Sequence, residues 1–284
     1  NDEEDGGGGG TTIGAFLDGA RASLEAGDYI AAEEACTAAI QADSSNATAW
    51  ALRSRARGAA GNVEGSLGDA SEALEIDPSD GDTWRWRAAL RLGMGECAGA
   101  ETDASEALAR SSDPGSALRI RAAARYALGQ WQGAADDCTL ALEVSPEDAG
   151  AWATRGRARG AMGDAEGALA DCTKALELDS SDAGAWRVRG AARLALGDPE
   201  AAFEDLTEAV ALDPDDARAY SIRSTVLLRL GRQAEALDDA VRAAELPDNT
   251  IPVADSEDDT DPNMGSADEI EEAETDEVRV IGVV

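Results

Sequence analysis

Arginine and aspartate are the residues with which this chain could do chemistry, and they recur at matched positions. Six arginines each stand eight residues before a glycine, and six aspartates each stand eight residues after it. A guanidinium beside a carboxylate can form a bidentate ion pair. The earliest copy has Gly19 and Ala35 at these positions, and the joint absence indicates that the two positions act together. We predict six structural ion pairs, within a hairpin or between neighbours: Arg53–Asp69, Arg87–Asp103, Arg121–Asp137, Arg155–Asp171, Arg189–Asp205 and Arg223–Asp239.

A second arginine series lies four residues further along the chain, and glycines stand opposite most of its members. We interpret these arginines as aliphatic stems that pack across the next segment while their charged heads stay in water. The arginines are Arg57, Arg91, Arg125, Arg159 and Arg193, and the glycines are Gly65, Gly99, Gly133 and Gly167.

Catalytic chemistry has no visible basis in the sequence. The chain has no histidine, which removes the commonest general base and the commonest metal ligand. It has no Walker loop, no dinucleotide-binding glycine motif after a strand, and no cysteine cluster with metal-ligand spacing. Cys36, Cys138 and Cys172 share one register, which is typical of small core residues in a reducing compartment, and we predict no disulfide. We expect a protein that is not an enzyme and needs no cofactor or metal.

The segments that carry these residues repeat at a fixed interval. Three registers recur every 34 residues over seven copies, and such a period defines the architecture before any other feature. They are a turn glycine (Gly27, Gly61, Gly95, Gly129, Gly163, Gly197, Gly231), an alanine (Ala39, Ala73, Ala107, Ala141, Ala175, Ala209, Ala243) and a large apolar residue (Phe16, Trp50, Trp84, Leu118, Trp152, Trp186, Tyr220).

One copy, residues 149–182, shows what each repeat should form. Apolar residues at helical spacing predict helices over 149–162 and 165–178, joined by a turn at Gly163 and Asp164. Asp182 is placed to cap the helix that follows. A single helical hairpin cannot bury its apolar face alone, so the hairpins must stack on one another.

This pattern resembles the tetratricopeptide repeat over about four fifths of the chain. The match rests on an aromatic at position 4 in six copies, alanine at position 27 in all seven, and Pro78, Pro146 and Pro214 near position 32. Arginine replaces the usual leucine at position 7, and Cys, Ala or Leu replaces a large aromatic at position 24. The resemblance implies an all-α, right-handed α-solenoid of seven helix-turn-helix hairpins over residues 13–247. An acidic, glycine-rich flexible segment (1–12) and an acidic, mostly disordered tail (248–284) would flank it.

The resemblance also implies a concave groove, lined by the first helix of each hairpin, that holds extended or helical peptides. Its usual positions carry mainly bases, which favours acidic peptides, although arginine scattered over every surface would look the same. Trp86 is either a ligand anchor or a packing residue between neighbouring repeats. The clamp of Lys and Asn used by chaperone-binding members is absent. The predicted groove residues are Arg21, Arg55, Arg85, Trp86, Arg119, Tyr126, Arg157, Arg187, Arg218 and Arg229.

Charge limits the partners that the chain can bind. The formal net charge is −34 at pH 7, and such a surface repels nucleic acid and anionic membranes. No apolar run approaches the ~20 residues that span a bilayer. We expect a cytoplasmic or nuclear protein, and since the first residue is not Met, organelle targeting stays open.

The tail supports several interpretations. Residues 255–277 are acidic and poor in large apolar side chains, so we predict disorder, with a short helix from Ser266 as the alternative. The apolar run at 278–284 could begin a further domain, bind the small ubiquitin-like modifier, or dock on the open end of the array. The acidic segment could also contact the basic groove and compete with partners, or merely keep the array soluble.

Together these patterns predict a non-catalytic protein–protein interaction scaffold or adaptor that binds peptide segments, acidic ones above all. Two alternatives stay open: a regulatory repeat region of a larger multidomain enzyme or chaperone-associated protein that continues past Val284, and a structural subunit of an assembly.

Overall fold

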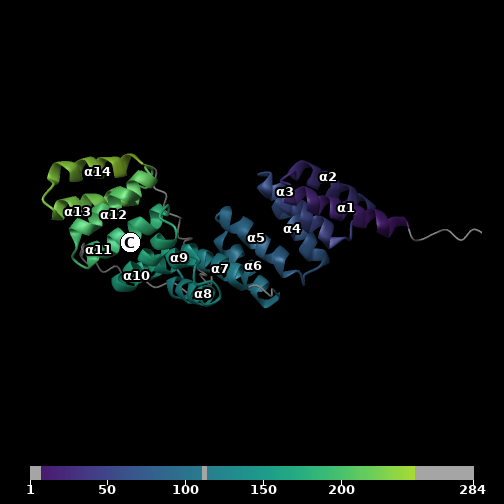
Figure 1. The fold of residues 1–284 in the computed structure, drawn as a ribbon, viewed down its shortest axis with the longest axis horizontal. Helices are drawn as coiled ribbons and strands as arrows, with labels where there is room; N and C mark the ends of the chain where they lie inside the picture. The colour runs from purple at the N-terminus through teal and green to yellow at the C-terminus, as the bar shows by residue number, and fades with distance from the viewer. Residues whose placement is uncertain (1–7, 111–113, 247–284) are drawn as a thin grey trace, which may run out of the picture. The chain divides into compact units, whose positions relative to one another are not determined.

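The computed structural model describes residues 8–110 and 114–246, and regular structure within these ranges is entirely α-helical. The described part of the chain holds fourteen helices, which follow one another as pairs joined by short turns (Figure 1). Helices of one pair pack together, as α3 does with α4, and consecutive pairs also touch, as α4 does with α5. The predicted all-α fold of seven hairpins is confirmed. The predictions for residues 248–284 lie outside the described residues.

The chain divides into two compact units, Asn1–Arg155 and Gly156–Val284, and the boundary falls within α9 (Ala149–Ala161). The first unit contains α1 (Gly8–Glu25), α2 (Tyr29–Ala42), α3 (Ala47–Ala59), α4 (Val63–Ile76), α5 (Gly81–Gly93), α6 (Cys97–Arg110), α7 (Pro114–Ala127) and α8 (Trp131–Val144). The second contains α10 (Ala165–Leu178), α11 (Ala183–Ala195), α12 (Pro199–Leu212), α13 (Ala217–Arg229) and α14 (Gln233–Glu245).

Each hairpin turns at its predicted glycine. All seven register glycines have positive φ, between 74° and 89°. A side chain in this left-handed region costs about 1–2 kcal/mol, so glycine is the residue that lets the chain reverse there. The next helices then start on polar caps. Asp182 accepts a hydrogen bond from the Ala185 backbone N–H, as predicted, and Asp164 accepts one from Gly167.

Small side chains build the interior. In the first unit, fully buried Ala20, Ala39 and Ala49 lie beside Leu17 and Leu52. Alanine and glycine let helices approach closely, and close packing supplies much of the stability of such an interior. The approach is tightest where a helix carries glycine on its inner face, as the following two positions show.

A Cβ at Gly156 would lie 2.6 Å from the Cys172 sulfur, and a Cβ at Gly190 would lie 2.8 Å from the Leu206 Cγ. Both distances are shorter than a real carbon contact. These glycines therefore bring the two helices of a hairpin together.

One boundary differs from the sequence prediction. Residues 1–12 were expected to be flexible, but α1 begins at Gly8. A helix that already exists extends at much lower cost than a new one forms. The helix that starts in the Ile13 region therefore continues backward through Gly8.

Candidate functional site

Five of the predicted Arg–Asp pairs lie within single hairpins. In each, the Nε and Nη2 atoms of the arginine bind the two carboxylate oxygens at 2.6–2.9 Å. The aspartates are buried, from 1% exposed at Asp103 to 7% at Asp239. The hydrogen bond that Arg53 donates to Asp69 raises the pKa of Arg53, and the one that Arg223 donates to Asp239 raises the pKa of Arg223. Arg155 and Asp171 belong to different units, so their pair stays a prediction.

Five of the six arginines in this series also stack on an aromatic ring one helical turn earlier, and the sixth, Arg121, follows Leu118 instead. The guanidinium carbon of Arg53 lies 4.7 Å from the centre of the Trp50 ring. A flat, weakly hydrated guanidinium suits such stacking. This contact explains how arginine fits where the repeat usually carries leucine. The further stacked pairs are Arg87–Trp84, Arg155–Trp152, Arg189–Trp186 and Arg223–Tyr220.

The charged heads of the second arginine series were predicted to stay in water, and this prediction was wrong. Each Nη1 binds the buried aspartate of its own hairpin, for example Arg57 with Asp69 at 2.9 Å. A buried carboxylate has four lone-pair sites, so one bidentate arginine leaves room for a second cation. The other pairs are Arg91–Asp103, Arg125–Asp137, Arg159–Asp171 and Arg193–Asp205, at 2.8–2.9 Å.

The predicted room for the arginine stems is present at three of the four glycines. A Cβ at Gly99, Gly133 or Gly167 would lie 3.1, 3.3 or 2.9 Å from the Cδ of the opposite arginine. At Gly65, the three atoms nearest to a Cβ all belong to the capping residue Asn62, the closest at 2.7 Å.

Arginines of both series also connect neighbouring hairpins. The sequence left open whether they act within a hairpin or between hairpins, and they do both. The Nη1 atom of Arg87 donates to the hydroxyl of Ser71 in the preceding hairpin at 3.1 Å. Arg57 binds Glu33 of the preceding hairpin at 2.7 Å. The sequence signal for these bridges was a hydroxyl residue at one position of the first six copies. These residues are Thr37, Ser71, Ser105, Thr139, Thr173 and Thr207, and the first four accept from the next hairpin's arginine.

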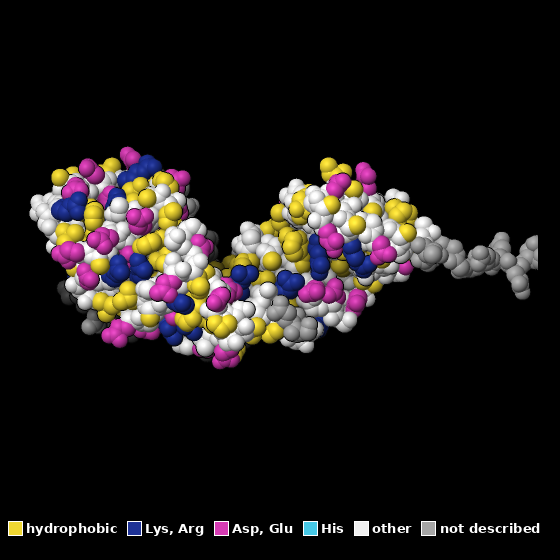
Figure 2. Space-filling view, in the orientation of Figure 1, with side chains coloured by type: hydrophobic (Ala, Val, Ile, Leu, Met, Phe, Trp, Pro, Cys, Tyr) yellow, Lys and Arg dark blue, Asp and Glu magenta, His cyan; other side chains and the backbone are white. Residues whose placement is uncertain are grey.

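Five of the eight predicted groove arginines are neutralised within the chain, which the pattern of bases did not predict. Three of them pair with an aspartate at the start of a later helix. The pairs are Arg21–Asp18, Arg85–Asp82, Arg119–Asp148, Arg157–Asp182 and Arg187–Asp216. Within the described residues, the guanidinium groups of Arg55, Arg218 and Arg229 have no ion pair. Figure 2 shows basic and acidic side chains intermingled over both units.

Trp86 takes the packing role of its two predicted alternatives. Its indole N–H lies 3.0 Å from the Ser54 hydroxyl and 3.2 Å from the Ser66 hydroxyl, both in the preceding hairpin. A Cβ at Gly58 would lie 2.6 Å from the ring. The tryptophan therefore fills a space that a glycine leaves between α3 and α5.

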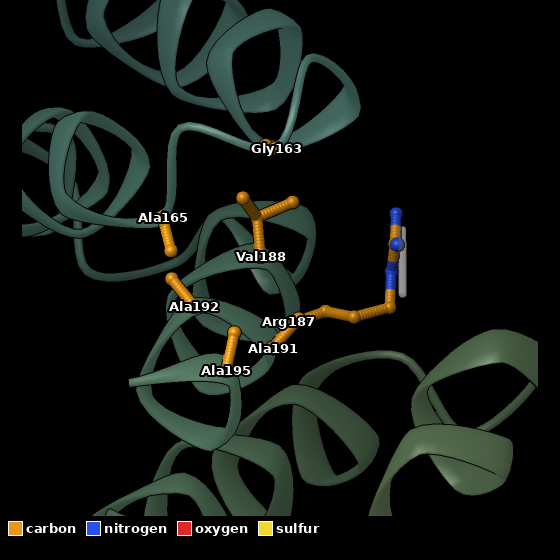
Figure 3. A pocket seen from close by; sticks show the side chains of 8 residues that line it. Gly163, Ala165, Arg187, Val188, Ala191, Ala192 and Ala195 are labelled. Carbon is orange, nitrogen blue, oxygen red and sulfur yellow. The ribbon is translucent and has the colours of Figure 1, made fainter. Parts of the chain in front are cut away.

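An apolar hollow opens on the first-helix face of the second unit. Its volume is about 60 Å³, close to that of two water molecules in bulk liquid. Val188 and Ala192 of α11 point toward Gly163 and Ala165, whereas the Arg187 side chain extends away along the rim (Figure 3). The hollow exists because the surrounding positions are small. Its lining is completed by Gly160, Ala191 and Ala195.

Two further positions of the predicted groove differ in solvent exposure. Tyr126 on α7 is partly buried. Leu228 on α13 is 58% exposed and adjoins Arg229. Leu228 occupies a usual groove position, but the predicted groove residues did not include it.

Burial makes the thiols poor nucleophiles. All four cysteines are buried, and Cys36, Cys97 and Cys172 are free thiols. Burial raises the pKa of Cys36 to about 11 and that of Cys172 to about 12. Within residues 8–110 and 114–246, no group of acids or cysteines is arranged to hold a metal ion. No helix there is long and apolar enough to cross a membrane.

Helical hairpins that pack in succession define an α-solenoid repeat protein. The sequence matches the tetratricopeptide repeat family over residues 17–81, 153–217 and 192–250, more than half of the chain. The chain belongs to this family. The family fold is a general scaffold for protein and peptide interactions and is generally non-catalytic. No protein of curated function matches the chain.

Solved structures support the same fold. A tetratricopeptide repeat protein from Parabacteroides merdae is 19% identical, with a TM-score of 0.62 over 84% of this chain and 94% of that one. YrrB, described as having an unusual peptide-binding site, is 20% identical, with a TM-score of 0.57 over 70% and 99%. A chain of the Cut9–Hcn1 hetero-tetramer of the APC/C is 17% identical, with a TM-score of 0.65. The match covers 79% of this chain and 44% of that one.

Proposed function

We propose that this chain is a non-catalytic scaffold that binds peptide segments combining acidic and small apolar side chains. The proposed face consists of α11 and α13 in the unit Gly156–Val284. The hollow beside α11 carries the proposal, because a surface cavity walled by Val188, Ala191, Ala192 and Ala195 can take a small apolar side chain. Peptide binding by the similarly folded YrrB supports the class of ligand.

The charge preference of this face comes from α13. Arg218 and Arg229 are exposed and free of ion pairs within the described residues, so they can meet carboxylates without breaking an internal contact. Leu228 adds an exposed apolar contact beside Arg229. Arg157 and Arg187 contribute less to affinity, because Asp182 and Asp216 already neutralise them.

Fluorescence anisotropy with a labelled peptide tests this function. The probe alternates acidic and small apolar residues, and a second probe carries lysine in place of each acid. The acidic probe should bind, and the joint change Arg218→Ala and Arg229→Ala should weaken it about tenfold or more, or about 1.4 kcal/mol. Lys174→Ala on α10 is the matched control, since it removes one exposed base from a second helix.

A substitution that fills the hollow tests the proposed face independently of the arginines. Ala195→Leu should place carbon in the cavity and weaken the acidic probe, whereas Ala170→Leu on the exposed side of α10 should not. Equal binding of the acidic and basic probes would contradict the charge preference. Unchanged affinity in both the arginine and the Ala195 variants would contradict the proposed face.

A further inference from the structure

The last described helix has apolar residues on its outer side. In α14, Leu237, Ala240, Val241 and Ala244 follow the i, i+3, i+4, i+7 spacing of one helical stripe, and all four are exposed. Leu237 is 66% exposed and Val241 is 50% exposed. Among the described helices, α14 contacts α13 alone. We call these four residues the α14 stripe.

The preceding hairpin shows what normally covers this surface. The residues equivalent to Leu237, Ala240 and Ala244 are Phe203, Leu206 and Val210 on α12, and they pack against α13. Thr207, which is equivalent to Val241, stays exposed. Leu206 is fully buried and Val210 is 8% exposed. Among the described residues, the α14 stripe therefore lacks the cover that α13 provides for α12.

The chemistry of the stripe favours an apolar cover over one built like the other hairpins. Each of the first six copies has serine or threonine at the register of Val241. In four of them this hydroxyl accepts a hydrogen bond from an arginine of the next hairpin. Valine cannot accept that bond, so an arginine-bearing hairpin would lose a polar partner there. The cover should instead be apolar.

We propose that the apolar run at residues 278–284 of this same chain packs on the α14 stripe. The run contains five aliphatic residues, one glycine and Arg279, without an acid. Arg279 would meet the exposed acid Asp238 beside the stripe. The proposal therefore matches apolar surface with apolar surface and base with acid.

The connecting segment is long enough. A random coil as long as residues 247–277 would have an end-to-end distance of about 30 Å, whereas a helix of the length of α14 spans about 20 Å. Tethering gives the run an effective concentration on the order of mM. A small contact area then suffices. A second copy of the chain would lack this advantage and would carry the same large negative charge.

Hydrogen exchange on the full-length chain tests the contact. Ile281→Asp should speed amide exchange in α14 about tenfold, or about 1.4 kcal/mol, and leave α2 unchanged. Ser266→Asp, which adds the same charge outside the run, should have no effect. Leu237→Ser should have the same effect as Ile281→Asp. The two changes together should add nothing further, because each removes one side of a single contact.

Three results would overturn the proposal. The first is exchange in α14 that Ile281→Asp leaves unchanged. The second is full additivity of the two substitutions. The third is α14 protection that rises with protein concentration, together with a dimer on light scattering that Leu237→Ser abolishes. That outcome would assign the stripe to a second copy.

Discussion

The aspartates at the centre of each hairpin carry the strongest residue-scale argument. Asp137 accepts from both Arg121 and Arg125, and each arginine also reaches the preceding hairpin. Removing such an aspartate leaves two guanidinium groups largely buried without their shared counter-charge. A buried ion pair of this kind is costly to break from one side, even where the intact pair adds little net stability.

Asp137→Ala should therefore lower the free energy of unfolding by about 3 kcal/mol, measured by urea denaturation. The neighbouring Asp136→Ala is the control, since Asp136 is exposed on the same helix and bonds only the Gln132 amide. The control should cost well under about 1 kcal/mol. Equal losses for the two variants would show that the shared counter-charge does not stabilise the fold.

The loop after α10 makes the stability of the fold depend on pH. Hydrogen bonds from the Ser181 hydroxyl and its backbone N–H lower the pKa of Asp179 below its usual value. The charged form is favoured in the folded state. Its contribution is therefore present above the unfolded pKa of about 3.9, and it is lost as pH falls through the folded pKa.

Ser181→Ala should raise the pKa of Asp179 toward its usual value, as an NMR titration of the carboxyl carbon would show. Ser180→Ala is the control, because only the Ser180 backbone carbonyl is bonded, by the Trp186 indole. A pKa that stays low without the Ser181 hydroxyl would assign the shift to the backbone bond alone.

At the scale of elements, glycine shows how much the sequence reveals. The seven turn glycines, the helices and the cap at Asp182 were predictable, because they depend on residues close together in the chain. The bridge from Arg57 to Glu33, the neutralised groove arginines and the hollow were not. They depend on which side chains meet after the hairpins stack, and a one-helix register does not contain that information.

The same substitution should have opposite effects in a turn and in a helix. Gly129→Ala should cost about 1–2 kcal/mol, because φ is +74° there, although the space around it is open. Gly68 is an exposed position within α4, and a Cβ there would meet no other atom within 4 Å. Gly68→Ala should therefore stabilise the fold by up to about 1 kcal/mol. Thermal unfolding midpoints that move in the same direction would contradict this assignment.

At the scale of the whole molecule, the proposed binding face and residues 255–277 carry opposite charges. The face presents Arg218 and Arg229, whereas the segment is rich in Asp and Glu. A tethered acidic segment should compete with acidic partners for Arg218 and Arg229. Replacing its Asp and Glu with Asn and Gln should tighten binding of the acidic probe, and the gain should shrink as salt screens the charges. An unchanged affinity at low salt would leave the segment a solubility role alone.

The central claim is that partners bind the first-helix face of the unit Gly156–Val284. Hydrogen exchange with and without a saturating amount of the acidic probe tests it most directly, because it locates the contact without any substitution. We expect slower exchange in α11 and α13, with exchange in α10 and α12 unchanged. Protection confined to α10 and α12, or no protection at saturation, would contradict it.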